Sequence, residues 1–188
     1  MQLATDRLIL RELVESDARR IFEIETIPKV GRYLSRNWDA VEEADEYVRG
    51  MILSATPTSA TPTEVTVPRR AFDFAVTVRG DDRLLGRCGM KRSDSDLRDA
   101  MFWYVLDPSA HGHGYATEAA RALLAFSFGE LALHRVWADV DPRNPPSVRV
   151  LERLGLRKEA HHLENVEIRG EWCDTVIYAM LRREWSAS

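Results

Sequence analysis

The chain has 188 residues, of which 45% are hydrophobic, and a formal net charge of −4 at pH 7. This length suits a single domain, 1–188, with a substantial core. The acidic balance gives no general attraction for nucleic acid. Two cysteines do not make a disulfide framework, and no apolar run is long enough for a membrane span or a secretory signal. We therefore expect a cytoplasmic protein without nucleic-acid or membrane partners.

The first third of the chain predicts one strand and two helices. Alternating apolar residues predict a short strand at 8–10. Ser16 and Asp17 are capping residues for a helix that runs to about residue 25 and is broken by Pro28 and Gly31. A second helix is expected at about 40–53. The Ser/Thr/Pro-rich stretch at about 54–70 then predicts a mobile loop within the domain.

The remainder of the chain predicts mostly strands. Strands are expected at 71–78 and 84–90, joined by a turn at Asp81-Asp82, and in a run ending at residue 106. A helix follows Gly114, then a strand at 135–140. A further helix is capped by Asn144 and ends at Gly155. Strands at about 156–168 and 172–181 complete an α/β (α+β) fold. Its mixed, mainly antiparallel sheet has about seven strands flanked by about four helices.

The stretch His111-Gly112-His113-Gly114-Tyr115 joins a buried strand to a helix. Two glycines permit a sharp turn and a close approach of the backbone to a ligand. The free amides at the start of the helix, together with the helix dipole, favour phosphate groups. A plain strand-to-helix turn is the alternative on these residues alone. A Walker loop and a dinucleotide fingerprint are excluded, because Ala116 and Thr117 stand where those motifs need other residues.

Four segments, in this order and spacing, resemble the GNAT superfamily of acetyl-coenzyme-A-dependent N-acetyltransferases, and within it the RimJ/RimL-type branch. They are the opening strand 5–11, the pyrophosphate loop 106–119, a second block at 141–156, and a C-terminal hairpin around 170–174. The branch acetylates protein N-termini and assorted small amines. The resemblance implies the GNAT fold, with acetyl-coenzyme A (acetyl-CoA) as cosubstrate. It implies no metal and leaves a homodimer open.

The resemblance also implies roles for residues of this chain. Asn144 and Ser147 would be catalytic, with Ser147 serving the leaving thiolate. Tyr33 and Trp38 lie on the loop between the first two predicted helices and are candidates for the wall of the acceptor site, with ordinary surface packing as the alternative. The residues implied to bind acetyl-CoA are Tyr104, Val105, Leu106, His111, Gly112, His113, Gly114, Tyr115, Ala116, Thr117, Asn144 and Ser147. On the residues alone, Asn144 is a helix cap and Ser147 a serine of the first helical turn.

Two features depart from the family pattern. His111 replaces the usual Gln or Arg, and Leu151 stands where the wider superfamily places a Tyr general acid. A glutamate that is common in the branch before the aromatic pair of the fourth strand is absent, because Met101 and Phe102 stand there. Glu12, Asp73 and Glu167 are candidate bases by strand position only. His161-His162 has no third ligand at a spacing that suits a metal.

The sequence therefore predicts transfer of an acetyl group to a primary amine, first a peptide or protein α-amine. Acetylation of a small-molecule amine is the alternative within the same chemistry. A non-enzymatic acetyl-CoA sensor is the alternative from a different class.

Overall fold

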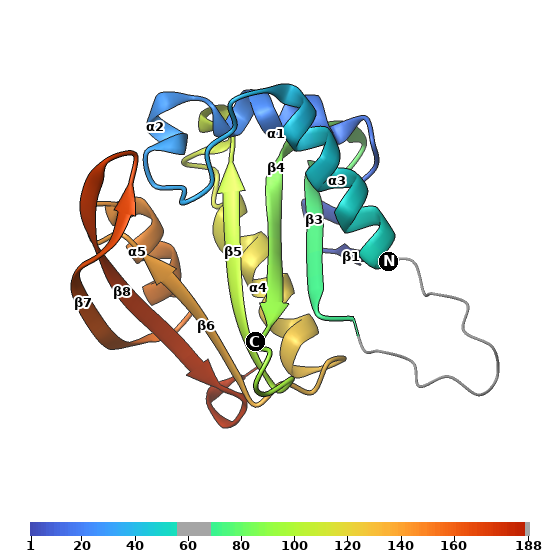
Figure 1. The fold of residues 1–188 in the computed structure, drawn as a ribbon. Helices are drawn as coiled ribbons and strands as arrows, with labels where there is room; N and C mark the ends of the chain where they lie inside the picture. Colours follow the sequence, from blue (N-terminus) through green and yellow to red (C-terminus); the bar gives the residue numbers. More distant parts are fainter. Residues whose placement is uncertain (56–68, 187–188) are drawn as a thin grey trace, which may run out of the picture.

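The computed structural model describes residues 1–55 and 69–186 of the chain. Its strands form one sheet in the order β1-β2-β3-β4-β5-β6-β8-β7. The strands are β1 (Gln2–Ala4), β2 (Leu8–Glu12), β3 (Ala71–Val78), β4 (Asp81–Arg92), β5 (Asp99–Leu106), β6 (Arg135–Val140), β7 (Arg157–Ile168) and β8 (Glu171–Leu181) (Figure 1). Neighbouring strands are antiparallel except β5 and β6, which are parallel.

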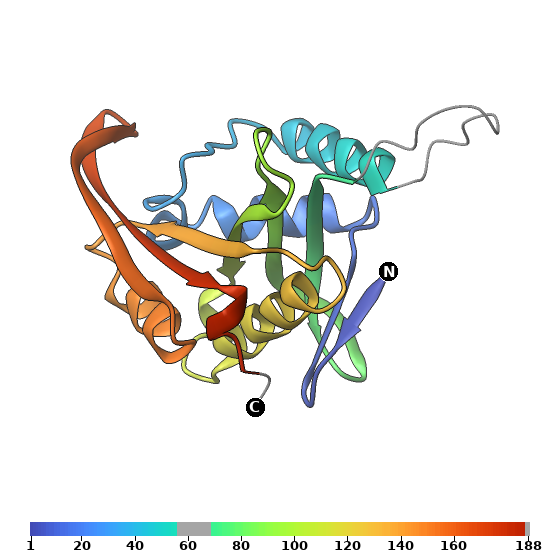
Figure 2. The same ribbon diagram turned by 90° about the horizontal axis from the view of Figure 1, so that it is seen from below.

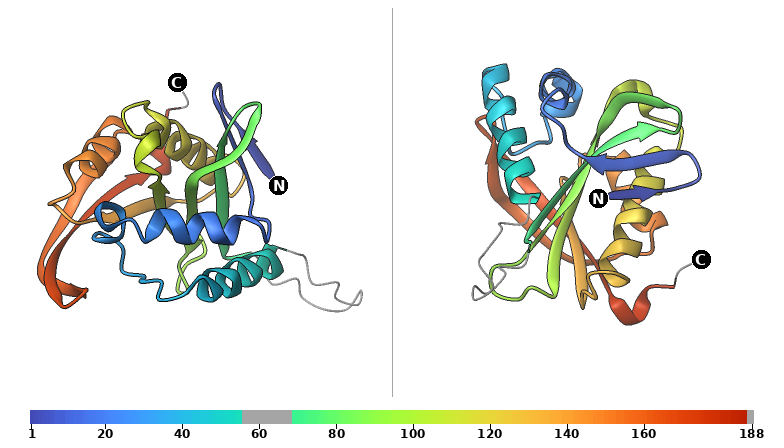
Figure 3. Two further views of the ribbon diagram at one scale, coloured as in Figure 1. Left: turned by 90° about the horizontal axis from the view of Figure 1, so that it is seen from above. Right: turned by 90° about the vertical axis from the view of Figure 1, so that its right-hand side faces the viewer.

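Helices cover both faces of this sheet (Figure 3). They are α1 (Asp17–Glu25), α2 (Pro28–Gly31), α3 (Val41–Ala55), α4 (Tyr115–Phe128) and α5 (Pro145–Arg153), with short 3-10 turns at η1 (Pro108–Ala110) and η2 (Arg182–Glu184). One core cluster joins α4 and α5 to the sheet, including Phe74 and Leu123. A second joins α1 and α3 to the opposite face, including Ile21 and Val48.

The predicted mixed sheet is confirmed, with differences at its edges. The described residues contain eight strands, because the three-residue β1 pairs with β2 and was too short for a periodic pattern. Pro28 and Gly31 bound the one-turn helix α2 rather than only breaking α1. Proline is tolerated there because the first helical amides lack intrahelical acceptors. Figure 2 shows the two sheet edges, β1 and the long β7–β8 hairpin.

Two local predictions can be compared directly with the structure. The β3–β4 turn lies at Arg79-Gly80, not at Asp81-Asp82, because Gly80 adopts the positive φ of +82°. Most of the Ser/Thr/Pro-rich stretch, at 56–68, lies outside the described residues. Asn144 is the N-cap of α5 as predicted, and Gly155 follows its end with a φ of +83°. No helix in the described ranges has the length and hydrophobicity to cross a membrane.

Candidate active site

The parallel strands β5 and β6 separate halfway along their length. Their pairing extends only from Asp99–Arg135 to Met101–Trp137. Beyond that point β6 continues to pair with β8 on its other side, up to Val140, so the two strands diverge (Figure 1). A cleft of about 960 Å³ passes through this opening, and residues of both sheet faces line it. A break in the middle of a sheet exposes backbone groups that a continuous sheet would pair.

The exposed backbone groups of β5 can be assigned from the strand alternation. The amide of Asp107 donates to the carbonyl oxygen of Leu85 on β4. In an antiparallel pair alternate residues face the same neighbour. The amides of Leu106 and Tyr104 therefore face the opening, whereas that of Val105 faces β4. The carbonyl oxygen of Leu106 supports this assignment, because it contacts Nε2 of His111 at 3.1 Å and not the strand β4.

The glycine turn leads directly from this opening into α4. Gly112 and Gly114 have φ of +81° and +78°, and Gly114 is the helix N-cap. A Cβ on Gly112 would meet no atom within 4 Å, so the turn is open on that side. Tyr115, Ala116 and Thr117 form the first turn of α4, whose amides have no intrahelical acceptors. This is a backbone cradle that suits an anion such as a pyrophosphate.

Arg7 braces the cradle from the β1–β2 turn, and its proximity was not predicted. Its guanidinium donates to the carbonyl oxygen of His113 at 2.9 Å and pairs with Glu118 at 2.6 Å. It also lies 4.9 Å from the centre of the Tyr115 ring. The bonds from Thr5 and Arg7 lower the pKa of Glu118, although its partial burial opposes this. Half of the Arg7 side chain is exposed, but its charge is paired with that of Glu118, so its contribution is to hold the His113 carbonyl and the turn in place.

Asn144 and Ser147 lie at the other side of the opening. The Asn144 side-chain oxygen accepts from the Ser147 amide at 3.3 Å, and both residues line the cleft. The hydroxyl of Tyr104, on β5, is 2.8 Å from Oγ of Ser147 and 3.1 Å from its carbonyl oxygen. Burial raises the pKa of Tyr104 to about 12, against the opposing effect of the Ser147 bond. The structure thus connects the predicted Ser147 to β5 across the cleft.

The two predicted acceptor residues have different surroundings. Tyr33 lines the cleft, and its hydroxyl donates to the carbonyl oxygen of Arg143 at 2.8 Å. Trp38 requires a correction, because its side chain is buried in the α1–α3 core and its indole donates to Glu25 at 2.8 Å. Between them in the chain, Leu34, Ser35 and Arg36 line the cleft instead. Removing the large apolar area of an indole from water is favourable, so Trp38 packs into the core although it lies in a loop.

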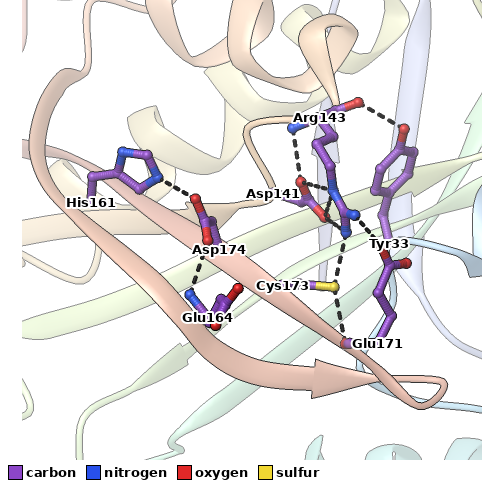
Figure 4. A network of polar contacts seen from close by, with 8 residues as sticks. All are labelled: Tyr33, Asp141, Arg143, His161, Glu164, Glu171, Cys173 and Asp174. Atoms are coloured by element: carbon purple, nitrogen blue, oxygen red, sulfur yellow. Dashed lines mark hydrogen bonds and ion pairs between the residues drawn. The ribbon is translucent and has the colours of Figure 1, made fainter.

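Arg143 joins the loop that carries Tyr33 and Arg36, here called the acceptor loop, to the β7–β8 hairpin (Figure 4). Its guanidinium pairs with Asp141 at 2.8 Å and with Glu171 at 2.6 Å, and it donates to Sγ of Cys173 at 2.9 Å. The tip of the same hairpin reaches α2, where the Arg169 guanidinium donates to the carbonyl oxygen of Gly31 at 3.2 Å. These contacts connect loops that are far apart in the sequence across one end of the cleft.

A buried ionic cluster supports the wall between α1 and β4. Arg87 pairs with Glu25 at 2.5 Å and with Asp73 at 2.7 Å. Tyr47 donates to Asp73 at 2.5 Å. Burial raises the pKa of Asp73, while the nearby guanidinium opposes that shift. Glu25, Tyr47 and Arg87 line the cleft, whereas Asp73 is fully buried behind them and is not a lining residue.

The three bases considered from sequence do not line the cleft, but other carboxylates of the described residues do. Three of them are paired, namely Glu25 with Arg87, Asp141 with Arg143 and Asp174 with His161, which leaves Asp139. Glu12 pairs with Arg69, and the exposed Glu167 lies on β7 outside the lining. Asp139 of β6 lines the cleft beside the opening and is exposed. Among the described residues, no side chain or amide is hydrogen-bonded to the Asp139 carboxylate. No sequence pattern marks this residue, because its importance depends on where β5 and β6 separate.

Of the two histidines considered for a metal, His161 has another partner. Nε2 of His161 contacts Asp174 at 2.9 Å, and the amide of Glu164 donates to the same carboxylate at 2.9 Å (Figure 4). Within 1–55 and 69–186, no group of three or more His, Cys, Asp or Glu side chains is arranged to hold a metal ion.

An opened parallel strand pair beside an anion cradle suits a transferase that binds an acyl-carrying coenzyme, which is the class that the family resemblance implies. The family model "Acetyltransferase (GNAT) domain" matches residues 7–157, and the chain belongs to this family. Bacillus subtilis YnaD, an uncharacterized N-acetyltransferase, is 29% identical over 99% of this chain and 100% of its own. The [Ribosomal protein uS5]-alanine N-acetyltransferase of Escherichia coli is 24% identical over 99% and 93%.

Solved structures agree with this assignment. A GNAT-family acetyltransferase from Bacillus anthracis superimposes with a TM-score of 0.81, at 27% identity, over 98% of this chain and 100% of its own. Mycobacterium smegmatis RimJ in complex with CoA-disulfide gives 0.79 at 25% identity, over 96% and 85%. Vibrio cholerae spermidine N-acetyltransferase with CoA and spermine gives 0.79 at 23%, over 96% and 98%. The protein is an N-acetyltransferase, and its family supports acetyl-CoA as the donor.

Proposed function

We propose that this enzyme acetylates a primary amine, in the first place the α-amine of a peptide or protein. The uS5-alanine N-acetyltransferase covers nearly the whole chain and supports an acceptor of this kind. The spermidine N-acetyltransferase supports a small polyamine as the second candidate, on likeness of fold alone. We further propose that the chain is of the RimJ/RimL type. The non-enzymatic sensor is set aside, because the chain is an N-acetyltransferase.

The single observation that carries the proposal is the cleft through the opening between β5 and β6. The anion cradle lies on the side of α4, and the acceptor loop with Tyr33 lies on the side of α2 and β7–β8. Acetyl-CoA would place its phosphates on the amides of Gly112 to Thr117 and its thioester in the opening. The acceptor amine would approach from the side of Tyr33.

The reaction then follows from the groups in the opening. The nitrogen lone pair of the neutral amine attacks the thioester carbonyl carbon, and the amides of Tyr104 and Leu106 stabilise the developing oxyanion. When the tetrahedral intermediate collapses, the C–S bond breaks and its electron pair passes to sulfur. Ser147 donates a hydrogen bond to that sulfur, and the thiolate takes its proton from solvent. The side-chain oxygen of Asn144 holds Ser147 in place by accepting a hydrogen bond from the Ser147 backbone amide. We propose Asp139 as the group that takes the proton from the amine, directly or through a water.

The test is a mass-spectrometric screen for acetylated product. The acceptors are short peptides with free or blocked N-termini, peptides with lysine, polyamines and amino-sugars. We expect a mass increase of one acetyl group on peptides with a free N-terminus and none on blocked ones. Efficient transfer only to polyamines or amino-sugars would favour the second candidate. Transfer only to hydroxyl groups would contradict the amine proposal altogether.

A further inference from the structure

Tyr104 makes contacts that its proposed coenzyme role does not explain. Its backbone amide faces the opening, but its hydroxyl reaches across to the first turn of α5. There it lies 2.8 Å from Oγ of Ser147 and 3.1 Å from the Ser147 carbonyl oxygen. The ring is half-buried and packs against the α4–α5 core beside Phe102. The hydroxyl is therefore fixed next to the serine that would face the leaving sulfur.

Counting protons shows why this contact matters. A tyrosine hydroxyl and a serine hydroxyl each carry one proton, and each oxygen can also accept. If Tyr104 donates to the Ser147 carbonyl, then Ser147 donates to Tyr104, and its proton points away from the cleft. If Tyr104 donates to Oγ instead, the proton of Ser147 is released for another acceptor. The orientation of one tyrosine proton thus decides whether Ser147 can donate into the cleft.

We propose that Tyr104 is a positioning residue whose hydroxyl donates to Ser147 and turns the serine proton toward the departing sulfur. This inference rests on the role proposed above for Ser147. A thiolate that forms beside Ser147 would attract the serine proton and favour this arrangement of the pair. The Ser147 oxygen becomes a better acceptor when Ser147 donates a hydrogen bond to the thiolate, so the bond from Tyr104 strengthens in the same step.

Tyr104 does not lose its own proton in this scheme. Burial raises the pKa of its hydroxyl to about 12, whereas an ordinary thiol has a pKa of about 8.5. Complete transfer from Tyr104 to the thiolate would be unfavourable by roughly a thousandfold or more. The same argument holds for Ser147, because an aliphatic hydroxyl is a weaker acid than a phenol. Both hydroxyls therefore keep their protons and stabilise the thiolate through hydrogen bonds, and the proton that completes the CoA thiol comes from solvent.

The simpler explanation is that Tyr104 only tethers α5 to the sheet. A second tyrosine offers a matched control for that explanation. Tyr178 of β8 donates to the carboxylate of Glu152 on α5 at 3.4 Å, away from the Ser147 end. Tyr178→Phe removes a hydroxyl contact between the sheet and α5 without touching Ser147. A tether alone predicts similar effects of Tyr104→Phe and Tyr178→Phe on catalysis.

The experiment is a double-mutant cycle with Tyr104→Phe, Ser147→Ala and the combined variant. Steady-state CoA release is measured with acetyl-CoA and the best acceptor, and CoA affinity by titration. We expect Tyr104→Phe to lower kcat about three- to thirtyfold, with CoA affinity unchanged. In the Ser147→Ala background the same substitution should have no further effect on kcat. Tyr178→Phe should leave kcat at the wild-type value.

Two results would overturn the inference. One is a wild-type kcat in Tyr104→Phe. The other is an equal loss of kcat with and without Ser147, because Tyr104 would then act independently of the serine. Whether the proposed class of acceptor is correct is tested separately, by the acceptor screen on the wild-type enzyme. If no amine is acetylated, the cycle is run on hydrolysis of acetyl-CoA by water, in which the same sulfur departs.

Discussion

Substitution of Gly114 tests the anion cradle most directly. Gly114 caps α4 with a φ of +78°, and Gly114→Val adds a branched side chain beside the amides that would hold the pyrophosphate. Its nearest new neighbour would be the Arg7 guanidinium, 3.5 Å from the added Cβ. We expect the variant to fold and to lose most of its affinity for acetyl-CoA.

The size of the effect can be worked out from the chain length. A ligand present at 100 times its Kd stabilises the folded state by about 2.7 kcal/mol. Unfolding 188 residues involves an entropy of about 0.4 kcal/mol/K, so this stabilisation raises Tm by about 7 °C. A hundredfold loss of affinity leaves about 0.4 kcal/mol and a shift of about 1 °C. The difference is easily measured in a thermal melt.

The substitution also strains the backbone, and this effect needs a control. A left-handed conformation costs a non-glycine residue roughly 1–2 kcal/mol, which lowers the Tm without ligand by about 3–5 °C. Gly80 has a nearly identical φ of +82° and open space around its added Cβ, and it lies in the β3–β4 turn. Gly80→Val should therefore lose similar stability but keep the 7 °C ligand shift. A full ligand shift in a folded Gly114→Val protein would refute the cradle.

Three further predictions concern the chemistry. Ser147→Ala should lower kcat about ten- to a thousandfold and raise the KM for acetyl-CoA much less, because the bond to sulfur matters mainly in the transition state; an unchanged kcat would reduce Ser147 to an ordinary helix residue. Asp139→Asn should lower kcat/KM about a hundredfold or more in steady-state assays. Glu167→Gln, outside the cleft, serves as its control, and equal activities would exclude Asp139 as the base. In a pH profile, kcat/KM should rise with a midpoint near 8 for an α-amine and near 10 for a lysine-like amine. Because the pKa of Tyr104 is raised to about 12, its hydroxyl stays protonated throughout, so the rise reports the acceptor amine; a midpoint near 6 for both kinds of amine would contradict this and assign the rise to a base on the enzyme.

Some features of the site depend only on residues that are close in the sequence, and these features could be predicted from the sequence. Gly112 and Gly114 predicted a turn with positive φ, because glycine is the residue that adopts it without strain. Asn144 and Gly155 predicted the start and end of α5 from capping chemistry alone. The limits of α1, β3 and β6 were similarly close to the predicted ranges, since hydrophobic periodicity reflects which side chains face a core. The strand β4 extends at both ends beyond its predicted range of 84–90.

Other features depend on contacts between distant segments, which no local pattern contains. Arg7 lies beside Glu118, and Tyr104 beside Ser147, only because the sheet order brings these segments together. Trp38 resembled a surface aromatic in the sequence, yet it is buried against Glu25. Asp139 became the candidate base only when the opening between β5 and β6 was located.

The sequence by itself therefore determined the order of the elements, the glycine turn and the family resemblance, because each of these depends on residue types within a short span. Tertiary structure decided which side chains surround the opening. That decision follows from where β5 and β6 separate, which involves three strands at once, because β6 stays paired with β8 from Arg135 to Val140 while its pairing with β5 ends at Met101–Trp137. The residues of β6 look like one continuous strand in the sequence, and only the tertiary structure shows that β6 keeps its pairing with β8 while it leaves β5 and opens the cleft.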